Sequence, residues 1–197
     1  MTTTTNATPR VPDAAWLEAR FGSGSLWRPD EADLPAELTD RETRNFLTST
    51  GFPAVAIDLV EFDSTHLRDA DEPYLFDADE LYGRRYPDDD SPPENFCFTI
   101  GMHFDQQLMV DTDIGEINHY DPSGWDHGDG DKGIATSSLP TLALLLGLVV
   151  ERRDALETDD DGIRHAAIAE LRVHMAAIEP EVDNSPFWDS VFDHLSA

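Results

Sequence analysis

Basic side chains are scarce in this chain of 197 residues: 13 lysine and arginine residues stand against 41 aspartate and glutamate residues, for a formal net charge of −28. A charge of this size repels the phosphates of nucleic acids and anionic membrane surfaces, so direct binding to either is disfavoured. The same field attracts cationic proteins and accelerates their encounter with the chain. A basic protein is therefore the expected partner, although the composition also suits solubility alone or adaptation to salt.

Cysteine is almost absent, and so are long apolar runs. Cys97 has no second cysteine to pair with, so no internal disulfide can form and the reducing cytoplasm is the expected compartment. Because Cys97 lies between Phe96 and Phe98, we expect its thiol to fill a core. The longest apolar run, 142–150, is too short to cross a bilayer, and residues 1–12 hold no apolar signal core. Neither export nor membrane insertion is expected.

The motifs of most enzyme classes are missing too. No glycine-rich loop followed by lysine is present to hold phosphate, and Ser123 lacks the two flanking glycines of a nucleophile elbow. A metal-assisted hydrolase centred on His119 stays open as an alternative, but its segment contains no HExxH motif and no paired cysteines. We therefore expect no catalytic residue, no metal and no cofactor. The ligands of the alternative would come from His119, Asp121, Asp126, His127, Asp129 and Asp131.

Apolar periodicity and capping residues predict helices at both ends of the chain. Asp13 and Asp40 are good N-caps for helices over 14–21 and 41–50, and Ser137 or Ser138 can cap a buried helix running to residue 150. Apolar residues at three- and four-residue steps predict an amphipathic helix over 163–178, and Phe187 to Leu195 form a short closing helix.

Strand patterns occupy the middle of the chain. A strand is predicted over 55–62 and a loop over most of 63–93, followed by strands over 95–102, 107–111, 116–120 and 134–136. The order of helices, sheet and helices favours an α+β fold over alternating βαβ units, with an antiparallel meander in the middle of the chain. We expect residues 1–12 to be a disordered leader and residues 13–197 to be a single domain.

Two acidic loops flank the predicted sheet. The first includes the run 88–90, and the second, 121–133, includes Trp125 among carboxylates. An aromatic side chain in such a setting can anchor a partner whose lysine and arginine residues pair with the acids, although Trp125 equally suits covering a sheet edge. The expected partner-facing residues are Asp88, Asp89, Asp90, Glu116, Tyr120, Trp125, Asp126, Asp129 and Asp131.

Short motifs in a characteristic order resemble the SUKH superfamily of bacterial immunity proteins, most closely its fourth subfamily. The resemblance covers the chain from about residue 30 to the C-terminus. The matching pieces are Leu34-Pro35, Phe46-Leu47, Gly51-Phe52-Pro53, Ile100-Gly101, Val110-Asp111, Gly115-Glu116-Ile117, Thr136-Ser137-Ser138-Leu139 and Phe187-Trp188.

The resemblance implies both a fold and a role. It implies an α+β fold in which a curved antiparallel sheet is wrapped by N- and C-terminal helices, in agreement with the α+β order of the residue patterns. It also implies an intracellular protein that binds and neutralises a secreted polymorphic toxin, often a nuclease or deaminase encoded beside it. Some members of the superfamily are general protein-interaction modules, so an interaction module without a toxin is the second hypothesis. No interface residue is carried over from the family.

Overall fold

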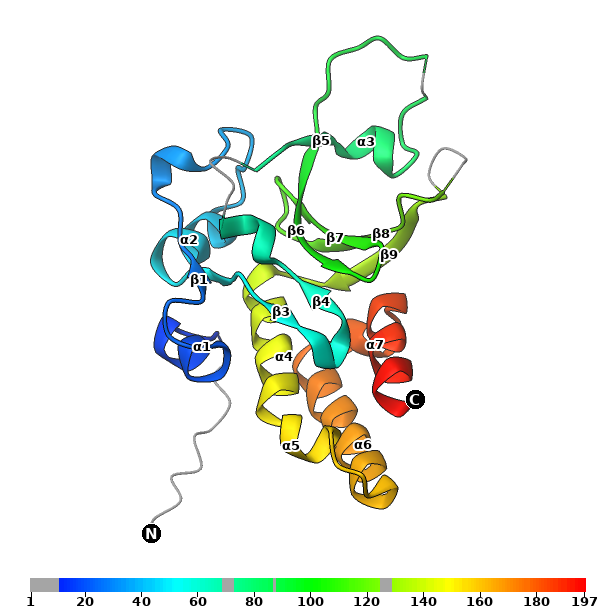
Figure 1. Ribbon diagram of the computed structural model, residues 1–197. Helices are drawn as coiled ribbons and strands as arrows, with labels where there is room; N and C mark the ends of the chain where they lie inside the picture. Colours follow the sequence, from blue (N-terminus) through cyan, green and yellow to red (C-terminus); the bar gives the residue numbers. More distant parts are fainter. Residues whose placement is uncertain (1–10, 69–72, 87, 125–128) are drawn as a thin grey trace.

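The protein is an antiparallel sheet with helices packed on one face (Figure 1), which confirms the predicted α+β class. The computed structural model describes residues 11–68, 73–86, 88–124 and 129–197. The first ten residues of the predicted leader lie outside the described residues. Within the described part of the chain, no helix is both long and apolar enough to span a bilayer.

The N-terminal segment forms two capped helices and a small sheet. Helix α1 (Ala14–Phe21) begins after Asp13, whose Oδ1 accepts a hydrogen bond from Trp16 N at 2.8 Å. Helix α2 (Arg41–Ser49) begins after Asp40, whose Oδ2 accepts from Thr43 N at 2.7 Å. Both predicted helices are confirmed, because each aspartate satisfies a free amide of the first turn. Between and after them lie η1 (Glu31–Asp33) and the paired strands β1 (Leu26–Trp27) and β2 (Phe52–Pro53).

The main sheet has the order β3-β4-β6-β7-β8-β9, with β5 paired to β6 beside β4, and every pair is antiparallel. The predicted meander is confirmed in β6, β7 and β8, and the last strand starts earlier than expected, at Asp131. The long strands are β6 (Phe96–His103), β7 (Gln106–Asp111), β8 (Ile117–Tyr120) and β9 (Asp131–Thr136).

The segment before β6 differs from the prediction. Residues 55–62 do not form one strand: β3 (Ala56–Ile57) and β4 (Phe62–Asp63) form a hairpin around η2 (Asp58–Val60), closed by Glu61 with a positive φ of 48°. The predicted loop also contains η3 (Thr65–Arg68), β5 (Phe76–Asp77) and α3 (Ala78–Leu81). Asp77 Oδ1 caps α3 by accepting from Asp79 N at 3.0 Å. Such short elements carry too few residues for a periodic signal.

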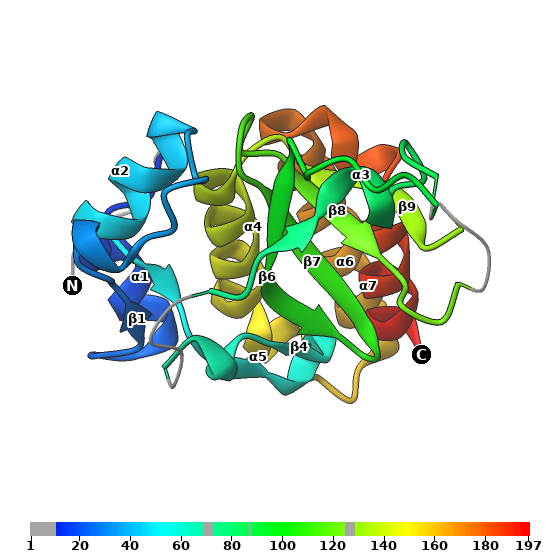
Figure 2. The same ribbon diagram turned by 90° about the horizontal axis from the view of Figure 1, so that it is seen from above.

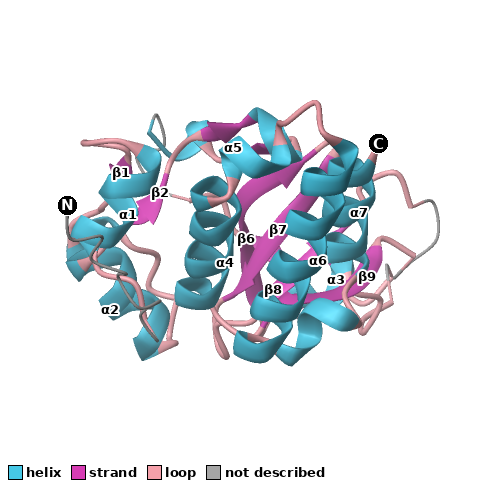
Figure 3. Ribbon diagram, turned by 90° about the horizontal axis from the view of Figure 1, so that it is seen from below, coloured by secondary structure: helices cyan, strands magenta, loops and turns pink. Residues whose placement is uncertain are grey.

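The C-terminal helices cover one face of the sheet (Figure 3). Helix α4 (Leu139–Glu151) is capped by Ser138, short α5 (Arg153–Leu156) follows, and α6 (Asp161–Ile178) starts after Asp160, whose Oδ1 accepts from Gly162 N at 2.9 Å. After η4 (Pro180–Asp183), helix α7 (Pro186–Ser196) closes the layer. One cluster of buried apolar side chains runs from Trp16 through the sheet to Leu195.

Candidate functional site

The register of the sheet assigns its side chains to two faces. Gly101, Leu108 and His119 are directly paired across β6, β7 and β8, so their side-chain positions share one face. Leu108 belongs to the apolar core, and a Cβ atom at Gly101 would collide with the buried ring of Phe62. The His119 ring lies 5.8 Å from the ring of Phe187 in α7. This face is therefore the one that packs against the helices.

The opposite face carries a row of directly paired residues, one from each of five neighbouring strands. Antiparallel partners project to the same side of a sheet, and five strands at 4.8 Å spacing make the row about 19 Å long. A carboxylate stands at each end, with a thioether, an amide and a phenol between them. We call this set the cross-strand row: Asp63, Met102, Gln107, Tyr120 and Asp131.

Part of the same face is covered by α3, which follows β5 (Figure 2). Ala78 and Tyr82 pack there against Cys97 and Met109, both fully buried. Burial raises the pKa of the Cys97 thiol to about 12, so the expectation that this cysteine fills a core is confirmed. Within the cross-strand row, Tyr120 packs against this cluster. The three inner residues of the row are half-buried, and its two terminal aspartates are exposed.

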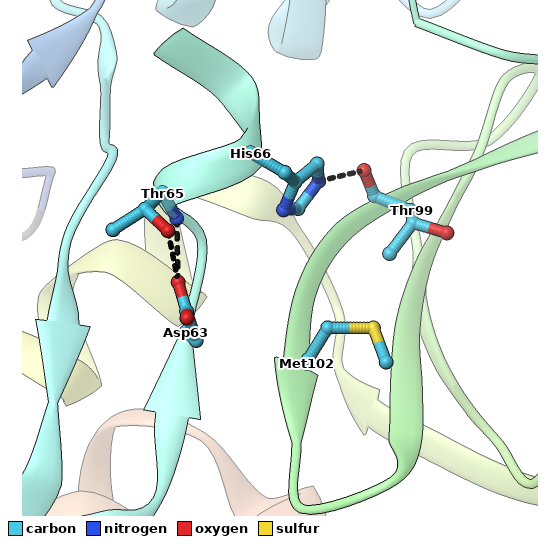
Figure 4. A pocket seen from close by; sticks show the side chains of 5 residues that line it. All are labelled: Asp63, Thr65, His66, Thr99 and Met102. Atoms are coloured by element: carbon cyan, nitrogen blue, oxygen red, sulfur yellow. Dashed lines mark hydrogen bonds between the residues drawn. The ribbon is translucent and has the colours of Figure 1, made fainter. Parts of the chain in front are cut away.

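A hollow of about 330 Å³ opens at the β4 end of the row, lined by Asp63, Thr65, His66, Thr99 and Met102 (Figure 4). Asp63 Oδ1 accepts hydrogen bonds from Thr65 N at 2.7 Å and Thr65 Oγ1 at 2.6 Å, and these bonds lower the pKa of the Asp63 carboxyl. His66 Nε2 lies 3.3 Å from the carbonyl oxygen of Thr99. The hollow therefore combines the apolar side chain of Met102 with the negative charge of Asp63 and the imidazole of His66.

The other end of the row contains three of the predicted partner-facing residues. Tyr120 is half-buried, with its ring 6.5 Å from the ring of Tyr82 in an edge-to-face arrangement, and desolvation raises its pKa. Asp129 and Asp131 are exposed, and Lys132 Nζ donates to the backbone oxygen of Asp129 at 3.0 Å. The structure thus brings one aromatic ring and two carboxylates together. Trp125 and Asp126 lie outside the described residues.

The predicted acidic run 88–90 lies in the segment that leads from α3 to β6, on the side of the sheet opposite the C-terminal helices (Figure 1). All three aspartates are exposed, and none of the ion pairs between described residues includes them. Asp89 Oδ1 accepts from Ser91 N at 2.9 Å and Ser91 Oγ at 2.6 Å, which lowers the pKa of Asp89. These charges are held on the same side as the cross-strand row and are free to meet a partner.

Glu116 is separated from the other predicted residues. It precedes β8, whereas Tyr120 ends that strand, so about 13 Å of extended chain lies between them. Its backbone oxygen accepts from Asp111 N at 2.9 Å and closes the β7-β8 hairpin. Asp111 Oδ1 also accepts from Asp113 N at 2.9 Å, and Gly115 has a positive φ of 72°, so a tight turn joins the two strands.

His119 does not join the acids of the hypothetical metal loop. It is only 2% exposed, its Nε2 lies 2.6 Å from Gln106 Oε1, and desolvation lowers its pKa to about 4. Its neighbour Tyr120 projects to the opposite face, together with Asp131. Nowhere in the described ranges do three histidine, cysteine or acidic side chains gather as metal ligands, and Asp126 and His127 lie outside those ranges.

Three residues of the cross-strand row were not predicted from the sequence: Asp63, Met102 and Gln107. The strand over 107–111 contained a signal for Gln107, because a polar residue there precedes the apolar Leu108. Met102 had no such signal, because a bulge between Thr99 and Gly101 shifts the alternation of β6. No such signal existed for Asp63, since its strand has only two residues. Its place in the row depends on pairing with Met102, 39 positions along the chain.

Comparison with known proteins agrees with this architecture. The family model described as SUKH-4 immunity protein matches residues 12–194, nearly the whole chain. No curated protein and no solved structure matches the chain. The family match confirms the resemblance noted in the sequence, the immunity role, and the prediction that the protein is not an enzyme. Its partner is accordingly a toxin, and the chain belongs to the SUKH-4 immunity protein family.

Proposed function

We propose that this protein neutralises a basic toxin, of the nuclease or deaminase class, by covering the toxin's active site with the open part of its sheet. The observation that carries the proposal is the cross-strand row, which exposes a carboxylate at each end and a half-buried tyrosine between them. Neutralisation requires no chemical step by the immunity protein. It requires only that the complex be stable enough to exclude the toxin's nucleic acid substrate.

The charge of the sheet region supports a basic partner. Residues 73–138 hold 15 acidic residues and three basic ones. Each of the three bases already faces an acid: Arg84 lies 3.9 Å from Asp79, Arg85 contacts Asp77 at 2.5 Å, and Lys132 lies 3.9 Å from Asp121. The remaining carboxylates therefore present a strongly negative surface. Such a surface accelerates the approach of a basic protein and disfavours nucleic acid, which is the toxin's own substrate class.

Tyr120 supports a stable contact in addition to a fast encounter. Tyrosine is among the residues that most often dominate binding energy, because it buries a large ring while its hydroxyl stays hydrogen-bonded. The ring of Tyr120 is already held by Tyr82 at 6.5 Å, so little side-chain freedom is lost on binding. A partner that covers Tyr120 would also approach the exposed Asp131, its direct partner on β9.

The proposed compartment is the cytoplasm of the producing cell or of its kin. The single cysteine, Cys97, is buried and needs no oxidising environment. The second candidate, an interaction module that has no toxin, would use the same surface. The two differ in their genetic neighbourhood, because only an immunity protein is expected to protect against the product of an adjacent gene.

The test is rescue from toxicity. We would co-express the chain with the protein encoded immediately upstream, and we expect the wild type to restore growth. Asp131→Lys should weaken binding of the purified toxin at least about tenfold, because it replaces an attractive charge by a repulsive one. Asp159→Lys is the matched control: it makes the same charge change at an exposed position between α5 and α6.

The two variants separate a specific surface from a general charge effect. If Asp159→Lys weakens binding as much as Asp131→Lys, only the net charge matters and the cross-strand row is not the contact surface. Suppose that the upstream protein is not toxic and that the wild type binds it without any effect on growth. That protein would then not be a toxin which this chain neutralises, and the chain would act on it as an interaction module.

A further inference from the structure

The hollow at the β4 end of the cross-strand row lies at a gap in the sheet. On one side of β6, β5 pairs with residues 96 and 97, and β4 pairs with residues 102 and 103. Between these pairs, Thr99 meets no other described strand on that side, and its carbonyl oxygen contacts the exposed side chain of His66 at 3.3 Å. Two partial strands on one edge therefore leave a recess that side chains line but do not fill.

The lining of this recess combines the Asp63 carboxylate, which has one oxygen without a hydrogen-bond partner among the described residues, with the apolar side chain of Met102 and the side chains of Thr65, His66 and Thr99. Thr65 occupies only Oδ1 of Asp63, and no hydrogen bond or ion pair within the described chain involves Oδ2. Met102 forms the adjoining wall (Figure 4). A second hollow of about 250 Å³ shares Asp63 and Met102, and its lining adds Asp58, Glu61 and Phe104. The described residues around both hollows include three acids and no lysine or arginine.

From this arrangement we infer that the recess beside Asp63 receives a cationic side chain of the partner, an arginine in preference to a lysine. The methylene stem of an arginine would pack on Met102 and Phe104, which is 51% exposed. Its planar guanidinium would donate to the free oxygen of Asp63, with Asp58 and Glu61 adding attraction. The identity of the partner rests on the proposed function, whereas the chemistry of the recess does not.

The experiment uses the full chain and N-acetylarginine amide as the probe. We would follow the backbone amide signals by NMR during a titration, and we expect shifts concentrated in residues 56–66 and 99–104. N-acetyllysine amide should bind more weakly, because a compact ammonium cannot form the planar contact. Shifts spread evenly over the acidic loops, or equal affinity for the two probes, would overturn the inference.

Two variants of equal charge make the test specific. Asp63→Asn keeps the oxygen that accepts from Thr65 and removes the negative charge, so we expect it to weaken the probe about fivefold, the effect of one partly exposed charge pair. Asp105→Asn removes one charge from the neighbouring β6-β7 turn without lining either hollow, and should change affinity less than twofold. Equal effects of the two variants would refute a site at Asp63.

A third variant places a cationic side chain of the protein itself in the recess. Met102→Lys places an ammonium beside Asp63, so the probe should no longer bind while the thermal transition of the protein is retained. Retained binding at the same amides would also overturn the inference. Because the probe requires no toxin, these results do not depend on the rescue assay, and the failure of one proposal is distinguishable from the failure of the other.

Discussion

The two faces of the main sheet differ in composition although they are made by the same strands. In β8, Ile117 and His119 project toward the helices, and the residues between and after them, Asn118 and Tyr120, project to the other side. The helix-covered face is largely excluded from solvent, with Leu108, Val110 and Ile117 fully buried. The other face is half polar and only partly covered by α3.

This contrast separates stability from recognition. The covered face contributes buried apolar area, which is the main source of folding free energy. The open face contributes exposed charge and a half-buried ring, which add little to stability and belong to the surface that we propose binds the toxin. Substitutions on the two faces should therefore have opposite consequences: the first kind unfolds the protein, and the second leaves a folded protein that no longer binds.

The largest effect is expected on the covered face, at Trp188. This side chain is fully buried, and its Nε1 donates to the carbonyl oxygen of Ala135 in β9 at 2.8 Å. Trp188→Ala should lower the free energy of unfolding by about 4 kcal/mol, through lost burial, a cavity and an unpaired carbonyl. Tyr120→Ala, on the open face, should cost only about 1 kcal/mol. Urea titrations followed by circular dichroism would measure both, and equal losses would break the distinction between the faces.

A smaller effect is expected from pH, again on the covered face. The pKa of His119 falls to about 4 in the folded protein because burial disfavours its charged form, whereas the unfolded value is about 6.5. The unfolded state therefore binds the proton first, and stability is lost as pH falls below 6.5 toward 4. Between pH 7 and pH 5 the wild type should lose about 2 kcal/mol more than His119→Gln.

A second buried histidine takes part in the same titration. His103, whose Nδ1 lies 2.9 Å from the oxygen of Val60, also has a lowered pKa because of burial. Its charge further lowers the pKa of His119, so the difference between the two proteins reports His119 together with its interaction with His103. If the free energy of unfolding changes with pH in the same way for the wild type and His119→Gln, then His119 titrates normally and is not buried beneath α7.

The smallest effect on stability is expected at the acidic run. The triple variant Asp88→Asn, Asp89→Asn and Asp90→Asn should change the free energy of unfolding by no more than about 0.5 kcal/mol, because all three side chains are exposed. It should instead slow toxin association severalfold at low salt, with a smaller effect as salt increases. Stopped-flow measurements at two salt concentrations would show this dependence.

A control on the helical side sharpens this result. Asp154→Asn, Glu157→Gln and Asp159→Asn together remove the same charge from exposed positions around α5. If both triple variants slow association equally, the toxin responds to total charge. If only the first one does, the segment between α3 and β6 faces the incoming toxin.

The parts of the fold that were predicted correctly are those with a local signal. Asp13, Asp40 and Ser138 cap the helices that follow them, since capping needs only a polar side chain three residues from a free amide. The meander of β6, β7 and β8 followed from alternation and turn residues. The β3-β4 hairpin was missed because each strand has two residues, and its turn depends on the positive φ of Glu61, a residue without a turn preference.

The candidate site was harder to predict than the fold. Tyr120, Asp129 and Asp131 were identified as partner-facing from composition, and the structure places them at one end of the cross-strand row. The recess at the other end was not identified, because Thr65, Thr99 and Met102 have no distinctive spacing in the chain. Glu116 was grouped with them for its charge, although strand β8 holds it at the far end of the hairpin.

The amino-acid sequence by itself determined the charge of this protein, its capped helices, its long strands and its family resemblance, because each of these depends on residues that are close together in the chain or on their sum. Only the tertiary structure decided which carboxylates share a surface with Tyr120 and which histidine is buried. The physical reason is that side-chain direction in a sheet alternates at every residue. A bulge or a shift in register therefore moves whole sets of side chains from one face of the sheet to the other.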